Sequence, residues 1–282
     1  MQTQTSWKWK IAAQASWFQW NLRELWQYKD LLGRFVRRDL IASYQQTVLG
    51  PLWIFVQPVL TTIVYWVIFS KIAKIPTEGI PPVLFYLPGI IIWNYFSDCL
   101  NGTMYTFVHN SAMFGKVYFP RLIVPLSIIL SHTVRMSVQL ILFVGIYLFY
   151  LFVTGTERPS FYIFLLPFLI LLPALFSLGA GLIISIITAK YRDLDYALQF
   201  ILRLFMFATP VVYPTSIVPV KYQFVFWLNP LTPVIESFRT AFFSTGTIHF
   251  GYFFISLLSI AVVLLIGVTL FKKRELKVMD II

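Results

Sequence analysis

Residues 136–153 read MSVQLILFVGIYLFYLFV, a run of 18 residues without a charged side chain. A helix of about 20 apolar residues crosses the hydrocarbon core of a bilayer, so this run predicts a helix inside a membrane. The surrounding apolar segment, 122–154, is too long for one crossing. We therefore expect one long helix whose first turns, up to Arg135, protrude from the bilayer.

The composition of the whole chain agrees with a membrane protein. Of the 282 residues, 59% are hydrophobic and 12% are charged, whereas about a quarter of the residues in a soluble domain carry charge. The first fifty residues lack an apolar run followed by a small-residue cleavage site, so no removable signal peptide is expected. Cys99 is the only cysteine, which excludes an intrachain disulfide.

Apolar runs of suitable length occur six times. The expected fold is therefore an all-α integral membrane protein with six transmembrane helices, preceded by a cytoplasmic segment over 1–49 and forming one transmembrane domain over 50–282. The predicted spans are about 51–72, 83–108, 122–154, 161–187, 197–212 and 252–271.

The distribution of positive charge predicts the orientation. With six spans both termini lie on one side, and that side carries fifteen of the 22 Lys and Arg residues, against five on the other. Positively charged loops stay in the cytoplasm, so both termini are expected to be cytoplasmic in a multi-pass protein of the inner (plasma) membrane. This topology explains the net charge of +11 without a nucleic-acid partner.

Two further segments are predicted to be helical without crossing the membrane. From Trp26 to Gln46 apolar residues recur every three or four positions between charged ones, which is typical of an amphipathic interfacial helix that acts as an anchor or also contacts a partner. The segment 215–250 is apolar but interrupted by Pro219, Pro230 and Pro233. It predicts two short helices on the outer side, about 220–228 and 232–243, forming a gate or a static connection.

Motifs of common enzymes are missing from the sequence. Gly115-Lys116 is followed by Val117 rather than Ser or Thr, so there is no phosphate-binding loop, and His109, His132 and His249 are too dispersed for a zinc site. We expect no catalytic residues, no metal and no cofactor on this chain.

Polar side chains follow one face of several predicted spans. Such residues face the bundle interior or a cavity, either as hydrogen-bonding contacts between helices or as the lining of a path. The third span carries Ser127, Ser131, Arg135 and Gln139 at steps of four. We predict a polar and aromatic channel lined by Gln57, Thr61, Tyr65, Trp93, Asn94, Asp98, Asn101, Tyr105, Gln199 and Arg203. We also expect Asp98 to pair with Arg135 or Arg203, because an unpaired charge in a span is costly.

Several motifs resemble those of one known family. They are LLGRFVRRDL at 31–40, LGPLW at 49–53, Phe119-Pro120-Arg121, YRDL at 191–194, TPVVYP at 209–214 and LNPL at 228–231 followed by Arg239. In this order and spacing they resemble the ABC-2-type permeases of the O-antigen, polysaccharide and teichoic-acid exporters. One departure is visible: the Arg-Tyr pair common before the LGPLW run is replaced by Ala42-Ser43-Tyr44.

The resemblance implies a function and partners. Such permeases are transmembrane homodimers that export an undecaprenyl-type lipid-linked polysaccharide and work with two ATP-binding cassette subunits, which bind the ATP and magnesium. It implies contacts with the ATPase at Arg34, Arg38, Phe119, Pro120, Arg121, Tyr191, Arg192 and Asp193. It implies an outer gate that includes Trp227, Asn229, Pro230, Glu236 and Arg239.

Two other classes are compatible with parts of the sequence. A membrane-embedded glycosyl- or acyl-transferase acting on lipid-linked sugars should show acidic residues clustered at one membrane face, and only Asp193 and Asp195 approach this. A secondary transporter should show repeated halves and several ionisable groups at mid-depth, whereas Asp98 is the only acidic residue deep in a predicted span.

Overall fold

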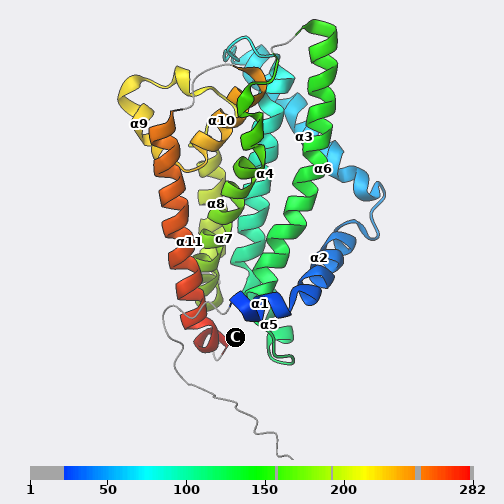
Figure 1. Cartoon of the computed structure of the whole chain (residues 1–282), viewed down its shortest axis with the longest axis vertical. Helices are drawn as coiled ribbons and strands as arrows, with labels where there is room; N and C mark the ends of the chain where they lie inside the picture. Colours follow the sequence, from blue (N-terminus) through cyan, green and yellow to red (C-terminus); the bar gives the residue numbers. More distant parts are fainter. Residues whose placement is uncertain (1–21, 156–157, 192, 245–248, 280–282) are drawn as a thin grey trace, which may run out of the picture.

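The computed structural model describes residues 22–155, 158–191, 193–244 and 249–279, and every regular element in these ranges is a helix. The long helices form one upright bundle, with α9 and α10 at one end and α1 and α5 at the other (Figure 1). We refer to these as the α10 end and the α5 end. The described ends of the chain, at α1 and at the last turns of α11, both lie at the α5 end (Figure 1).

The elements follow one another along the chain with short connections. They are α1 (Leu22–Gln27), α2 (Lys29–Tyr44), η1 (Gly50–Leu52), α3 (Trp53–Tyr65), the π-helical η2 (Trp66–Ile72), α4 (Pro82–Met104), α5 (Thr106–Phe114), α6 (Ile123–Thr154), η3 (Phe161–Leu165), α7 (Leu166–Lys190), α8 (Leu194–Phe207), η4 (Thr215–Ile217), α9 (Val220–Leu228), α10 (Thr232–Phe243) and α11 (Phe250–Met279).

Five helical segments of the described chain have the length and apolarity to cross a membrane. They are Gly50–Ile72, Pro82–Met104, Ile123–Thr154, Phe161–Lys190 and Phe250–Glu275. All five lie where spans were predicted. The long helix over 122–154 and the two short helices α9 and α10 were also predicted at these positions.

The helix predicted over 197–212 is different in the structure. α8 begins at Leu194 and ends at Phe207, and its 14 residues rise about 21 Å, which is less than a hydrocarbon core of about 30 Å. Residues 208–213 form turns because Pro210 and Pro214 cannot continue a helix. The predicted helix bounds were wrong here because the apolar turn residues were counted as helix.

A second difference concerns the end of the predicted span 83–108. α4 ends at Met104, and the backbone leaves the helical conformation at Tyr105 (φ −100°, ψ 11°). The hydroxyl of Thr106 donates to the carbonyl of Thr103 (2.8 Å) at this bend, and α5 begins as a separate helix.

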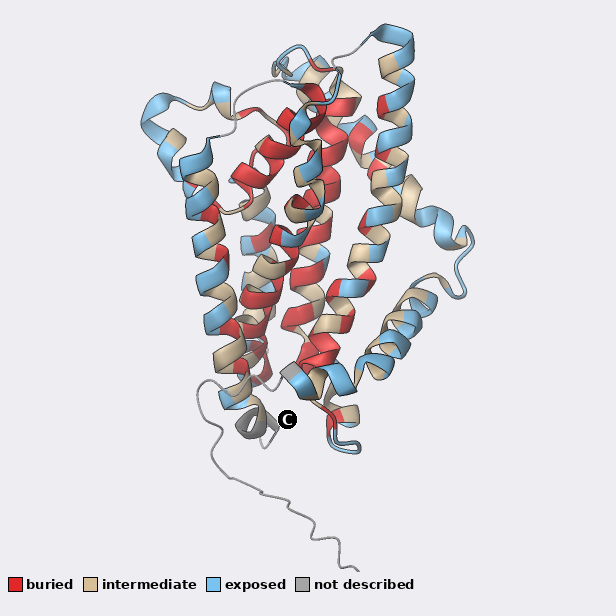
Figure 2. Cartoon of the chain, viewed as in Figure 1, coloured by how far each residue is buried: buried red, intermediate tan, exposed pale blue. Residues whose placement is uncertain are grey.

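Helix α4 forms the centre of the bundle. It is in contact with α3, α6, α7 and α10, and Figure 2 shows its ribbon largely in the colour of buried residues. Tyr86, Phe85 and Phe96 are among its fully buried side chains. By contrast, α3 and α8 have outward faces with exposed apolar side chains, as expected of surfaces in contact with lipid or with another chain.

Two glycines allow α7 and α11 to cross at backbone contact. A Cβ built on Gly267 would lie 2.3 Å from the carbonyl oxygen of Gly179, and one built on Gly179 would lie 2.6 Å from Cα of Leu264. Small residues let helices pack closely in membranes. Burying apolar side chains contributes little to helix association there, because the lipid tails are equally apolar. Any side chain here must push the two helices apart.

We therefore predict that Gly267→Ala destabilises the protein by about 1–3 kcal/mol, since overpacking displaces backbone rather than a flexible side chain. The measurement is the thermal midpoint of the detergent-solubilised protein. Gly145→Ala in α6 is the matched control, because nothing lies within 4 Å of its Cβ position. An equal loss of stability in both variants would contradict the prediction.

Candidate functional site

Polar residues of α4 and α8 meet toward the α5 end. The side-chain Nε2 of Gln199 donates to Oδ1 of Asn101 (2.7 Å) and to the hydroxyl of Tyr105 (3.3 Å). The Tyr105 ring stacks on His109, with 5.1 Å between ring centroids. Polar residues of the predicted spans 83–108 and 197–212 are thus in contact, although α8 is shorter than predicted.

Aromatic side chains continue this contact toward the α10 end. Trp93 is buried, and its ring packs against Phe205 of α8 (5.9 Å between centroids). The hydroxyl of Tyr65 on α3 donates to the sulfur of Met206 (3.7 Å). The ends of α3 and α8 therefore meet at this contact, and Trp93 of α4 contributes to packing rather than to an open surface.

The remaining predicted channel residues are not all gathered at this contact. Gln57 and Arg203 are exposed on α3 and α8, and Thr61 and Asn94 are half-buried. The hydroxyl of Thr61 donates to the carbonyl of Gln57 in its own helix (2.9 Å). Within one copy of the chain, these side chains form separate groups rather than a single lined tube.

A polar cavity lies where α2, α3, α4 and α6 meet. Its volume is ≈ 230 Å³, and its lining includes Ser43, Tyr44, Gln57, Tyr95, Asp98, His132, Arg135 and Gln139. The Asp98 carboxylate lies 4.0 Å from Nδ1 of His132. The amide of Gln139 donates to the carbonyl of Ile54 (3.1 Å) and ties α6 to the start of α3.

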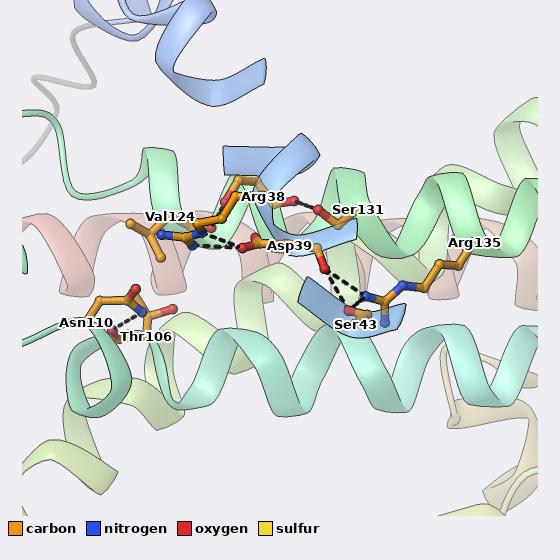
Figure 3. A network of polar contacts seen from close by, with 9 residues as sticks. Arg38, Asp39, Ser43, Thr106, Asn110, Val124, Ser131 and Arg135 are labelled. Atoms are coloured by element: carbon orange, nitrogen blue, oxygen red, sulfur yellow. Dashed lines mark hydrogen bonds and ion pairs between the residues drawn. The ribbon is translucent and has the colours of Figure 1, made fainter. Parts of the chain in front are cut away.

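Arg135 is directed toward α2 rather than paired with Asp98. Its Nη2 donates to the Ser43 hydroxyl and to the carbonyl of Asp39 (3.5 Å), as Figure 3 shows. Its guanidinium also lies 5.5 Å from the ring centroid of Tyr44. The predicted pairing of Asp98 with an arginine is therefore not found in the structure. The two charges share a cavity, and Arg203 lies elsewhere because α8 turns it outward.

A second cavity extends this space toward the α5 end. It has a volume of ≈ 390 Å³, shares Ser43, His132 and Arg135 with the first, and reaches Arg38, Asp39, His109 and Asn110. Arg38 and Asp39 form an ion pair at 2.8 Å (Figure 3). The two cavities together form a polar groove beneath α2.

At the α10 end, Arg239 is buried inside the bundle with 2% of its surface exposed. Its guanidinium lies 3.8 Å from the centroid of the Phe85 ring, and Nη2 donates to the carbonyl of Val211 (2.9 Å). Nη1 contacts Glu236 at 3.4 Å. The Glu236 carboxylate accepts the backbone N–H of Thr215 (3.3 Å). The pair thus joins α10 to the segment after α8. Burial raises the pKa of Glu236, and the neighbouring Arg239 opposes part of that rise.

Other predicted gate residues hold the same segment in place. Nδ2 of Asn229 donates to the Thr209 hydroxyl (2.8 Å) and to the carbonyl of Ala208 (3.2 Å). The carbonyl of Pro230 accepts a hydrogen bond from Ser256 of α11 (2.7 Å). The ring of Trp227 stacks on Tyr252, with 5.1 Å between centroids. A hydrogen bond from Ser216 to Glu78 (2.5 Å) links this segment to the loop between α3 and α4.

The predicted coupling residues at the α5 end divide into buried and exposed ones. Phe119 is buried and packs edge-on against Phe35 of α2 (5.8 Å between centroids). Nη1 of Arg121 donates to the carbonyl of Glu275 (2.5 Å), and Pro120 is half-buried. Phe119 and Arg121 therefore position this loop. The exposed members are Arg34, Arg38, Tyr191 and Asp193, while Arg192 lies outside the described residues.

Sequence analysis missed the most exposed aromatic side chain of this loop. Tyr118 is 84% exposed, and Val117 beside it is also exposed. The carboxylate of Glu24 in α1 raises the Tyr118 pKa, because a nearby negative charge disfavours the phenolate. Hydropathy does not show which residues of a short loop are buried and which are exposed. Only the fold reveals that Tyr118 is exposed and Phe119 is buried.

These features define a class of protein. The described chain is a multi-pass helical membrane protein with a buried ion pair at one end, polar cavities near the other, and exposed side chains on a loop at the α5 end. Among its described residues, no three His, Cys, Asp or Glu side chains gather into a metal site.

The chain belongs to the ABC-2 type transporter family, whose sequence model matches residues 31–243. It is 24% identical over 253 residues to the O-antigen export system permease protein RfbA of Klebsiella pneumoniae, covering 90% of this chain and 95% of that protein. A Myxococcus xanthus protein of the same name is 29% identical over 227 residues, covering 79% and 84%. The polysialic acid transport protein KpsM of Escherichia coli is 25% identical over 246 residues, covering 84% and 91%. The family resemblance of the sequence motifs is thereby confirmed.

We predict that Arg239→Gln lowers the free energy of unfolding by about 3–5 kcal/mol, because it leaves Glu236 buried without its partner. Lys221→Gln, on an exposed residue of the neighbouring α9, is the control and should change it by less than about 0.5 kcal/mol. Adding Glu236→Gln to Arg239→Gln should recover part of the loss, as measured in a double-mutant cycle. Additive effects of the two substitutions would show that the pair is not coupled.

Proposed function

We propose that this chain is the transmembrane subunit of an ABC exporter that moves a lipid-linked polysaccharide out of the cytoplasm through the inner membrane. The observation that carries the proposal is its similarity, over most of its length, to permeases named for O-antigen export and polysialic acid transport. ATP and magnesium are bound by a separate cassette subunit, and this chain is not itself an enzyme. The carrier lipid is of the undecaprenyl type.

The proposed active form is a homodimer. The ends of α3 and α8 meet through Tyr65 and Met206, and both helices leave exposed apolar side chains, including Leu60, Ile63 and Phe200, together with the polar Arg203. Polar residues on a lipid-facing surface are costly, so a second copy covering this surface would place them in a shared channel. The aromatic rings along it provide flat apolar surfaces on which sugar rings slide.

The proposed topology has six crossings with both termini in the cytoplasm. α8 alone is too short, but the chain after it continues toward the α10 end, where the carbonyl of Val211 lies 2.9 Å from a Cβ built on Gly89 of α4. Because Gly89 lies in the first half of α4, which begins at the α10 end, α8 and 208–213 together extend far along that helix. The α5 end is then the cytoplasmic end, and α9 and α10 form a re-entrant outer gate.

The surface proposed for the ATP-binding subunit is at the α5 end. Tyr118, Val117 and Tyr191 expose apolar surface there, and Arg34 and Asp193 are exposed beside it. α2 packs on α6 and, through Phe35, on Phe119. A movement of the attached ATPase would therefore be transmitted to α6 as well as to the loop.

Depletion of this chain tests the proposed function. Cells without it should accumulate completed polysaccharide on its lipid carrier inside the cell, and the wild-type gene should restore surface polymer. Tyr118→Ala should fail to restore export and should retain about tenfold less ATP-binding subunit on co-purification, the effect of losing an interface hot spot. Phe161→Ala, an 82% exposed ring at the α10 end, is the control. Loss of polymer synthesis instead of export would favour the transferase alternative.

A crosslink tests the proposed gate. In a Cys99→Ala background, Glu78→Cys and Ser216→Cys joined by a reducible bis-thiol reagent should stop export while ATP hydrolysis continues, because the outer segment can no longer separate from the α3–α4 loop. Reduction should restore export. Arg158→Cys with Ser244→Cys, which ties α10 to the loop it already contacts (3.0 Å), is the control. Undiminished export with the first crosslink fully formed would make the segment a passive connection.

A further inference from the structure

The polar cavity beneath α2 contains two opposite charges that do not form an ion pair with each other. Arg135 and Asp98 both line it, but Arg135 binds Ser43 and the carbonyl of Asp39. The Asp98 side chain is 57% exposed, and its nearest ionic contact is His132 at 4.0 Å. Nε of Arg135 is buried and makes no hydrogen bond with any residue in the described part of the chain. Separate charges at such a position are costly unless something else pairs with them.

The cavity lies where the apolar parts of two spans begin. Trp53 and Ile54 in its wall are the first residues of α3, and Arg135 directly precedes the uncharged run 136–153 of α6. These are the positions at which a membrane-spanning helix passes from the headgroup layer into hydrocarbon. Beyond the cavity, α6 continues with exposed aliphatic side chains, including Ile141, Val144 and Leu148.

The lining is suited to a headgroup with one charge of each sign. A phosphate would accept hydrogen bonds from the Arg135 guanidinium and the Tyr44 hydroxyl, and a primary ammonium would donate to the Asp98 carboxylate. A pyrophosphate is a poorer ligand, because its second negative charge would face Asp98 within the same ≈ 230 Å³. Gln57 and Gln139 add neutral donors and acceptors to the wall.

We propose that the cavity between α2, α3, α4 and α6 binds the headgroup of an aminophospholipid, phosphatidylethanolamine, with its phosphate on Arg135 and its ammonium on Asp98. The acyl chains lie against the exposed aliphatic residues of α6. The lipid is a resident component that fixes the end of α2 against the bundle, since Ser43 and Tyr44 close the same cavity. The proposal does not depend on which polymer is exported.

Site-directed photocrosslinking tests this assignment. The full chain carrying Trp53→benzoylphenylalanine, at the rim of the cavity, is reconstituted into vesicles of equimolar phosphatidylethanolamine and phosphatidylglycerol. Leu148→benzoylphenylalanine, on the outward part of α6, reports the bulk lipid ratio. The mass of each adduct identifies the bound molecule and distinguishes a lipid from a free phosphoethanolamine group.

The expected result is an adduct ratio at Trp53 about tenfold richer in phosphatidylethanolamine than at Leu148, corresponding to one charge-assisted hydrogen bond. Asp98→Asn should return the ratio to the bulk value, and Arg135→Gln should reduce adducts of both lipids. Arg135→Lys, which keeps the charge, should preserve the preference even if α2 docks less firmly. Lys116→Gln, exposed in the loop before α6, should change nothing.

Three results would overturn the proposal. The first is a bulk-like ratio at Trp53 in the wild-type chain, and the second is a preference that survives Asp98→Asn. The third is obtained with vesicles that also contain undecaprenyl pyrophosphate: its recovery at Trp53 in preference to phosphatidylethanolamine would make the cavity a site for the carrier lipid.

Discussion

The arrangement of the protein depends on the close packing of α4 at the centre of the bundle. Helices in a bilayer satisfy their backbone internally and associate through close contact rather than through exclusion of water. α4 is in contact with α3, α6, α7 and α10, and Gly89 admits the backbone of residue 211 at 2.9 Å. The segment after α8 therefore lies against α4 even though it is not helical, and α10 is positioned by that segment.

This packing also determines where polar groups are tolerated. Arg239 is buried at the α10 end because the Phe85 ring, the carbonyl of Val211 and Glu236 surround its guanidinium. Near the other end, Asp98 and Arg135 line a cavity, where a polar ligand or water would reduce the cost of their charge. Arg239 and Glu236 thus stabilise a fixed junction at the α10 end. Asp98 and Arg135 remain accessible from the cavity that they line.

Prediction from sequence was accurate where one physical property was sufficient. Hydrophobic length located five spans, periodicity located α2, and proline positions separated α9 from α10. The helix bounds predicted over 197–212 were wrong, because turn residues such as Val211 are as apolar as those of a helix, and hydropathy does not record backbone direction. Prediction from sequence also grouped Asp98 with the arginines by charge alone, whereas the guanidinium of Arg135 is directed to Ser43.

The amino-acid sequence alone was sufficient to predict that the chain crosses a membrane and resembles polysaccharide permeases, because both follow from local composition and ordered motifs. The tertiary structure was needed to show which polar residues are in contact with one another. Gln199 reaches Asn101 from 98 positions along the chain, and Arg121 reaches Glu275 from 154. Such pairs depend on how the helices are rotated and shifted relative to one another in the bundle. Packing at helix crossings, such as the one at Gly179 and Gly267, fixes that arrangement. Local sequence patterns do not show that these two positions are in contact.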